Sequence, residues 1–177
     1  MQPILDTITK RYSPYSFEDK SITMEDLNTL LDAARRAASS YNEQPWRFIY
    51  ATRDNEEEWN RMLDILVPQN REWAKNASAL MLSVAKKTSI VTGKPNPYSF
   101  HDTGMAMGNL LNQATSMGIY VHQMGGYDRS KAIDFLNIPD EYQPVAMIAL
   151  GYPDKNEKRE GTSRNPLDSF VFKGSWQ

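Results

Sequence analysis

Helices and strands follow one another along this chain without a repeated βαβ unit of constant length. Regular alternation is typical of a parallel sheet, whereas an irregular order of the two elements favours an α+β fold with a mixed sheet. The 177 residues fit one domain and are enough chain for a sizeable core. Because no internal repeat and no linker divides the sequence, we expect a single domain over residues 1–177.

Composition excludes several classes of function. A net charge of −2, from 20 basic and 22 acidic residues, gives no reason to expect a nucleic acid or membrane partner. The absence of cysteine excludes disulfides, thiolate nucleophiles and cysteine zinc sites, and is compatible with the cytoplasmic location that we expect. Only His101 and His122 are present, so we expect no metal site built from histidines. The N-terminus does not resemble a signal peptide, and no apolar run is long enough to span a bilayer.

Hydrophobic periodicity and end signals predict the order of the main elements. A helix capped by Thr23 and a helix capped by Asp128 are expected. A long helix capped by Asp102 or Thr103 is expected to run to Met117 and to be closed by Gly118. Strands are predicted at residues 46–52, 79–85, 119–122 and 145–150, the last being the most apolar and therefore central; a further helix is predicted at 55–66.

Two features suggest that the chain packs against something beyond its own core. Gly104 and Gly108 lie inside the long helix, where each glycine costs about 1 kcal/mol relative to alanine. Their spacing implies close approach by a neighbouring helix or by a partner chain. Apolar side chains also recur in the C-terminal tail, where they could cover a second subunit or form an edge strand: Phe170, Val171, Phe172 and Trp176.

The segment SSYNEQPWRF at residues 39–48 is unusually polar for a junction between a helix and a strand. Such loops often contact ligands. Amide side chains such as that of Asn42 offer a donor and an acceptor on one planar group, and Ser39 offers a rotatable hydroxyl, which suits a flat heterocycle. The alternative is an ordinary turn satisfied by its own side chains.

Several common catalytic motifs are missing from the sequence. No G-x-G-x-x-G opens a helix, and Gly93 with Lys94 lacks the upstream glycine of a phosphate loop. His101 and Asp102 could form a base with its orienting carboxylate, but a helix-capping role for Asp102 is favoured. No sequence context supports a Ser/His/Asp triad. We therefore expect no catalytic side chain.

Four segments, in order, resemble the motifs of the FMN-dependent nitroreductase family. RYSPYSF at residues 11–17 is similar to R-R-S-x-R-x-F, and residues 38–48 are similar to P-S-S-x-N-x-Q-P-W-x-F with Ala38 in place of proline. Residues 102–118 with Gly125 and Gly126 resemble the family's small-residue helix and glycine turn. Residues 145–153 and 164–167 resemble its A-L-G-Y-P strand and R-x-P-L tail.

The resemblance implies a three-layer α/β/α sandwich with a mixed, mainly antiparallel sheet. It also implies an intertwined homodimer, with residues 161–177 as a tail that embraces the partner subunit. FMN is the implied cofactor, NADH or NADPH the transient reductant, and a nitroaromatic, quinone or enone the electron acceptor. The flavin would carry the chemistry, with the protein supplying position and electrostatics.

The resemblance also assigns roles to individual positions. Arg11 and Arg164 correspond to cations on the FMN phosphate and ribityl chain, and Gly125 and Gly126 to a turn whose backbone N–H approaches flavin N5. Hydrogen-bonding or backbone contacts with the flavin are implied for five further residues, two of them (Ser39 and Asn42) from the other chain: Tyr12, Ser13, Ser39, Asn42 and Asn70. Gln44 is expected to hold its own loop.

Three positions depart from the family pattern, because Tyr12, Tyr15 and Thr162 stand where members carry basic residues. Fewer cations favour weaker FMN binding or a lower reduction potential. A flavin-binding or ligand-binding dimer with little turnover is therefore the alternative function, and a structural dimer without cofactor is a third.

Overall fold

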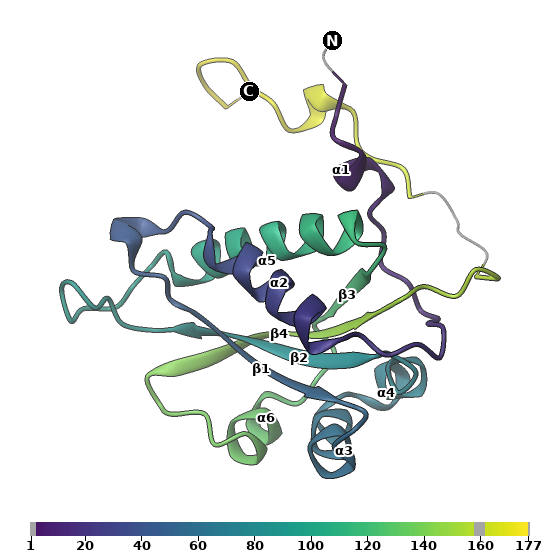
Figure 1. Cartoon of the computed structure of the whole chain (residues 1–177). Helices are drawn as coiled ribbons and strands as arrows, with labels where there is room; N and C mark the ends of the chain where they lie inside the picture. Colours follow the sequence, from purple (N-terminus) through teal and green to yellow (C-terminus); the bar gives the residue numbers. More distant parts are fainter. Residues whose placement is uncertain (1–2, 158–161, 177) are drawn as a thin grey trace.

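The computed structural model describes residues 3–157 and 162–176. Its centre is a sheet of four strands in the order β1-β2-β4-β3, and all of the described pairings are antiparallel (Figure 1). The strands are β1 (Trp46–Thr52), β2 (Ala79–Lys86), β3 (Tyr120–Met124) and β4 (Tyr142–Gly151). The α+β class is confirmed. The antiparallel pairing that we expected to dominate accounts for the whole sheet within the described residues.

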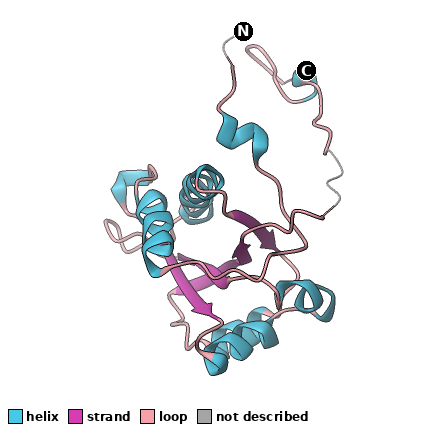
Figure 2. Cartoon of the chain, turned by 45° about the vertical axis from the view of Figure 1, so that its right-hand side comes forward, coloured by secondary structure: helices cyan, strands magenta, loops and turns pink. Residues whose placement is uncertain are grey.

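Helices cover both faces of this sheet and form the expected three layers (Figures 1 and 2). One layer contains α2 (Met24–Arg35) and α5 (Ser99–Ser116), and the other contains α3 (Glu56–Ile65), α4 (Pro68–Ala74) and α6 (Arg129–Phe135). The short helix α1 (Asp6–Lys10) and the 3₁₀ turns η1 (Ser40–Asn42) and η2 (Leu167–Ser169) complete the described elements. Seven of the eight side chains of β2 are buried, because helices lie above and below it.

Local signals explain where several of these helices begin and end. Thr23 and Asp26 form a reciprocal capping box at the start of α2. The Asp128 carboxylate accepts the Lys131 N–H at 3.1 Å and caps α6. Gly118, with a φ of 71°, follows the end of α5 in the left-handed conformation that glycine tolerates. These three predictions are confirmed.

The predicted start of one helix is wrong, and another helix was missed. The helix α5 begins at Ser99 rather than at Asp102 or Thr103, so neither residue is its N-cap. Asp102 instead accepts a hydrogen bond from the Ser40 N–H at 3.0 Å, which explains its burial inside the first turn. The helix α4 was not predicted: it begins at Pro68, a residue well suited to the first turn, but it is only seven residues long and has little periodicity.

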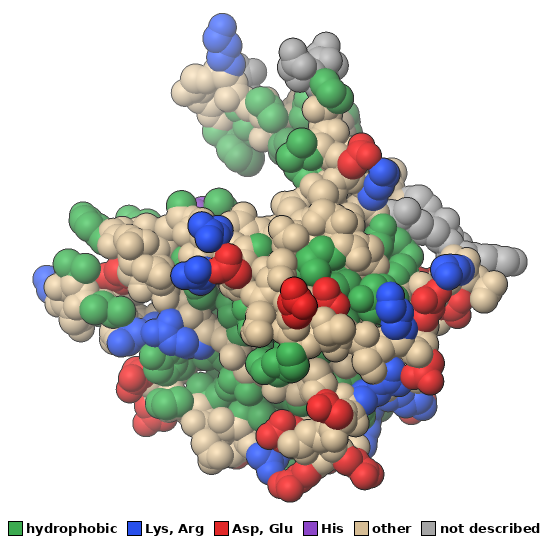
Figure 3. All heavy atoms as spheres, viewed as in Figure 1, with side chains coloured by type: hydrophobic (Ala, Val, Ile, Leu, Met, Phe, Trp, Pro, Cys, Tyr) green, Lys and Arg blue, Asp and Glu red, His purple; other side chains and the backbone are tan. Residues whose placement is uncertain are grey.

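The two ends of the chain project together from the layered body, near one end of α5 (Figure 1). Hydrophobic side chains are visible on both projecting segments (Figure 3). In the N-terminal segment Ile4 and Leu5 are 65% and 70% exposed, and in the tail Trp176 is 86% exposed. Within the described residues, none of the helices combines the length and the apolar character needed to cross a membrane.

Candidate functional site

The segment at residues 11–17 is tied to the end of β4. Phe17 forms an isolated antiparallel bridge with Pro153, and Asp154 donates its N–H to the Ser16 carbonyl at 3.1 Å. A Cβ on Gly151 would lie 2.6 Å from the Phe17 ring, so this glycine permits the ring to pack on the strand. The first and fourth motifs of the sequence therefore meet in space, although more than 130 residues separate them.

Arg11 and Ser13 lie together on this segment, beside the start of β3. The Arg11 guanidinium donates to the Ser13 hydroxyl at 3.4 Å. The ring of Tyr12, between them, packs on the ring of Tyr120 with centroids 4.7 Å apart. A guanidinium next to a hydroxyl forms an anion-binding pair, because arginine presents several N–H donors in a fixed fork.

An aromatic cluster joins the same segment to β3 and α4. The His122 ring lies 4.5 Å from the Trp73 ring and 4.6 Å from the Tyr15 ring. Its Nδ1 lies 2.9 Å from the Pro14 carbonyl; since a carbonyl can only accept, Nδ1 carries the proton. Burial lowers the pKa of His122 from its ordinary value, against the opposing effects of the Pro14 carbonyl and of Glu157. His122 is therefore a neutral packing residue at neutral pH.

The turn after β3 presents one open glycine and one packed glycine. A Cβ on Gly125 would meet nothing within 4 Å, so the backbone there is accessible to a ligand. A Cβ on Gly126 would lie 2.7 Å from the Asn70 side chain and 3.0 Å from the Val67 side chain. Asn70 donates to the Gly126 carbonyl at 3.0 Å and thereby holds the turn against α4. Asn70 thus fixes the turn, and the flavin contact that we expected of it stays a prediction.

The loop at residues 39–44 has an unusual backbone conformation. Tyr41, Asn42 and Gln44 have positive φ angles of 51°, 57° and 48°. The Ser39 hydroxyl accepts the Gln44 N–H at 3.0 Å, and the Gln44 amide donates to the Asn42 carbonyl at 3.1 Å. Gln44 therefore holds its own loop, as expected.

The predicted site residues form two groups at opposite edges of the sheet. The first group surrounds β3 and contains Arg11, Tyr12, Ser13, Asn70, Gly125 and Gly126. The second, Ser39 and Asn42, lies just before β1 (Figure 1). Strands lie about 4.8 Å apart, so three spacings put the two edges roughly 14 Å apart. The structure does not bring the two groups together within one chain.

Arg164 belongs to neither group. It lies in the exposed tail and donates to the carbonyls of Thr162 and Ser163 at 3.2 and 3.3 Å, within the tail itself. We expected residues 161–177 to form a tail that packs against a partner. Residues 161 and 177 of this tail lie outside the described residues, as do residues 158–160 before it.

These groups have the chemistry of a binding site. Arg11 and Ser13 suit a phosphate, Gly125 leaves its backbone open to a flat ligand, and Asn42 and Ser39 offer amide and hydroxyl groups to a heterocycle. They fit FMN in donor type and in accessibility. Among the described residues, no group of three or more acidic or histidine side chains is placed to hold a metal ion.

Comparison with known proteins identifies the class. The model of the nitroreductase family matches residues 8–152, so the chain belongs to this family. The expected oxidoreductase class and fold are thereby confirmed.

Individual relatives agree in fold and extent. A protein of Archaeoglobus fulgidus, provisionally named NADH dehydrogenase/NAD(P)H nitroreductase, is 32% identical over 173 residues and covers 89% of each chain. The FMN reductase (NADPH) of Bacillus subtilis is 26% identical, over 86% of this chain and 67% of its own. A crystal structure of an oxidoreductase containing FMN superposes with a TM-score of 0.92 at 33% identity, over 99% of this chain and 94% of that one.

Proposed function

We propose that this protein is an FMN-dependent oxidoreductase that transfers electrons from NADH or NADPH to a small electrophile. The observation that carries the proposal is that two features lie along the same edge strand, β3: the Arg11–Ser13 pair beside its start and the open Gly125 turn at its end. The FMN-containing structural relative and the NADPH-dependent FMN reductase among the relatives support it. When bound, FMN supplies the hydride-accepting and electron-donating chemistry.

In this proposal the residues around β3 hold the cofactor. Arg11 and Ser13 bind the phosphate and ribityl end, and Gly125 and Gly126 expose backbone N–H groups beside the ring. Asn70 keeps the glycine turn in place through its bond to the Gly126 carbonyl. Tyr12 orients this segment by packing on Tyr120.

The proposal also requires a homodimer, because Ser39 and Asn42 would complete the site of the partner subunit. Two observations support this arrangement. The exposed apolar residues of both chain ends need a surface to cover, since large exposed apolar patches usually mark interaction sites. A Cβ on Gly104 or Gly108 would meet nothing in the same chain, which leaves close approach by a partner as the reason for these glycines. Arg164 would reach the cofactor by way of the embracing tail.

The electron acceptor is proposed as a class: nitroaromatics, quinones and enones. Each is flat enough to stack on an accessible flavin ring. In the described part of the chain, no dinucleotide-binding motif offers the nicotinamide a separate binding site. Reductant and acceptor then take turns in one place, in the cytoplasm. The alternative of a flavin-binding dimer with little turnover is favoured by Tyr12, Tyr15 and Thr162 at positions where family members carry basic residues.

Steady-state kinetics test whether NAD(P)H and the electron acceptor bind in turn at the same place on the flavin. Varying NAD(P)H against a quinone should give parallel double-reciprocal lines, because each substrate leaves before the other binds. In stopped flow, NAD(P)H alone should bleach the flavin absorbance before any acceptor is added. Intersecting lines, or bleaching only when both substrates are present, would mean two separate sites. A bound flavin that neither substrate changes would favour the alternative function.

A further inference from the structure

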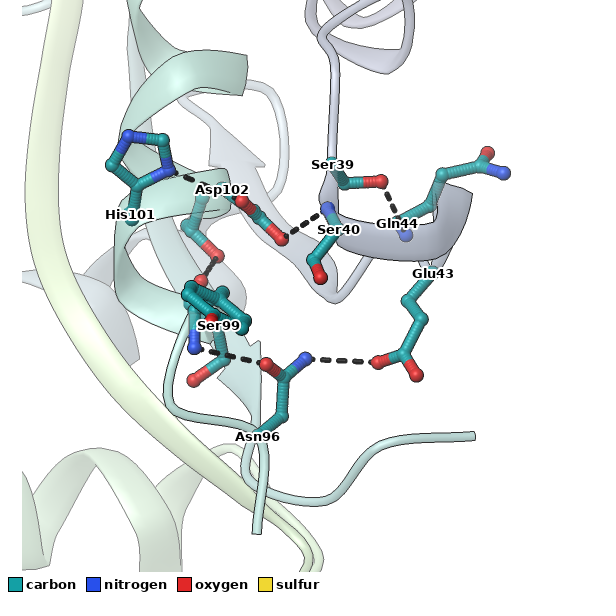
Figure 4. A network of polar contacts seen from close by, with 10 residues as sticks. Ser39, Ser40, Glu43, Gln44, Asn96, Ser99, His101 and Asp102 are labelled. Atoms are coloured by element: carbon teal, nitrogen blue, oxygen red, sulfur yellow. Dashed lines mark hydrogen bonds and ion pairs between the residues drawn. The ribbon is translucent and has the colours of Figure 1, made fainter. Parts of the chain in front are cut away.

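Glu43 is a buried carboxylate in the middle of the loop at residues 39–44, with only 9% of its surface exposed. Three donors from residues 89–96 converge on it. Oε1 accepts from the Ser89 hydroxyl and from the Val91 N–H, the latter at 3.3 Å. Oε2 accepts from the Asn96 Nδ2 at 2.9 Å (Figure 4). An ionised carboxylate is acceptor-only, and here it faces donors alone.

Asn96 is held so that it must donate to Glu43. It is 8% exposed, and its Oδ1 accepts the Tyr98 N–H at 2.9 Å. This bond orients the side-chain amide, with its NH₂ group toward the Glu43 carboxylate. Turning the amide over would place that NH₂ group against the Tyr98 N–H and leave two donors facing one another.

The contacts of Glu43 close a loop that is held in a conformation most residues avoid. Tyr41, Asn42 and Gln44 all have positive φ angles, which persist in non-glycine residues when the surroundings enforce them. A second buried carboxylate, Asp102, fixes the same loop from α5 through the Ser40 N–H. Figure 4 shows Asp102 pointing from α5 at the Ser40 N–H of the loop, and Glu43 pointing from the loop toward Asn96.

We propose that Glu43 is a positioning residue for the cofactor site: by gathering Ser89, Val91 and Asn96 it holds the loop in the shape that presents Asn42 to the FMN of the partner subunit. This inference rests on the proposed function. It assigns to Glu43 no contact with the flavin, since its side chain points toward Asn96 and into the protein.

An exchange of groups between Glu43 and Asn96 tests the proposal. In Glu43→Gln the new NH₂ group faces a donor in either orientation of the amide, the Asn96 NH₂ or the Val91 N–H, and in Asn96→Asp two carboxylates face each other. Each single variant should weaken FMN binding by about tenfold, the scale expected for loss of a hydrogen bond to a charged group. The double variant Glu43→Gln with Asn96→Asp restores every bond and the net charge, and should return to within about threefold of wild type.

Two measurements on the apoprotein keep positioning apart from folding: the Kd for added FMN, and hydrogen exchange of the amides at residues 39–44. The single variants should exchange faster in this loop while the strands stay protected, and the double variant should recover. Glu57→Gln, at an exposed carboxylate on α3, is the control and should change neither readout. If Glu43→Gln does not fold, Ser89→Ala removes one donor to Glu43 together with the acceptor of the Thr92 N–H, brings no two donors face to face, and should cause a smaller loss of affinity.

The outcomes are distinct. Wild-type affinity and loop protection in both single variants would overturn this inference alone. A double variant no better than the singles would show that the pair does not act together, and would overturn it as well. A wild-type protein that binds no added FMN would overturn the proposed function and this inference together.

Discussion

Replacing Arg11 by alanine should weaken FMN binding by about ten- to a hundredfold, because a hydrogen bond to a charged group contributes about 1.5–3 kcal/mol. The thermal midpoint should change less than the affinity, since Arg11 lies outside both hydrophobic cores. Fluorescence titration of the apoprotein with FMN measures the affinity.

Arg36→Ala is the matched control for this loss of charge. Arg36 lies at the end of α2, is exposed, and pairs with Asp32 at 3.2 Å, so its removal should leave FMN binding unchanged. Arg164→Ala should behave like Arg11→Ala if the tail carries its guanidinium to the cofactor. Either arginine variant that keeps wild-type affinity would mark its residue as a surface charge.

Subunit mixing should show a site shared between chains. When Arg11→Ala is on one chain and Asn42→Gly on the other, both changes fall in the same site and the second site stays intact. About half of the bound FMN should then keep wild-type affinity. When both changes are on one chain paired with a wild-type chain, each site carries one change and none is intact. Glycine is the suitable replacement for Asn42 because it tolerates the φ of 57°.

Differently tagged chains allow the mixed dimers to be purified, and light scattering across a dilution series checks that they persist. The opposite pattern, with an intact site only when both changes are on one chain, would mean that each chain completes its own site. A stable monomer loaded with FMN would contradict the shared site in the same way.

The parts of the fold that sequence predicted well depend on interactions between near neighbours. The capping box of Thr23 and Asp26, the Asp128 cap and the end of α5 at Gly118 involve residues at most three positions apart, and β1 was predicted at its observed bounds. Such signals are readable because their physical cause is contained in a few consecutive residues.

The errors arise where contacts between residues far apart in the sequence determine the role of a residue. Asp102 is of a residue type that commonly caps helices, but it accepts a hydrogen bond from the Ser40 N–H, 62 positions away. Glu43 was not predicted as a structural residue, because an acidic side chain among amides and hydroxyls looks exposed; its donors lie 46 to 53 residues further along. Likewise, local patterns could not separate the two groups of site residues, since the strand order that puts β1 and β3 at opposite edges is a property of the whole sheet; only the family resemblance assigned Ser39 and Asn42 to the other chain.

The resemblance to the family motifs supplied what local patterns could not. It assigned residues from distant segments to one cofactor site; the pairing of Phe17 with Pro153 was not predicted and is seen in the structure. The roles of Arg11, Ser39, Asn42 and Arg164 toward a cofactor remain predictions, because they depend on a bound flavin and on a second chain.

Chromatography of the chromophore released by the purified protein tests the central claim most directly. The protein should be yellow, and denaturation should release FMN at about one per chain. The residues Arg11, Ser13 and Gly125 suit one phosphate and one flat ring, and the sequence contains no second nucleotide motif for an adenine half. Release of FAD would contradict the proposed cofactor. A colourless protein that takes up no added FMN would contradict the account as a whole.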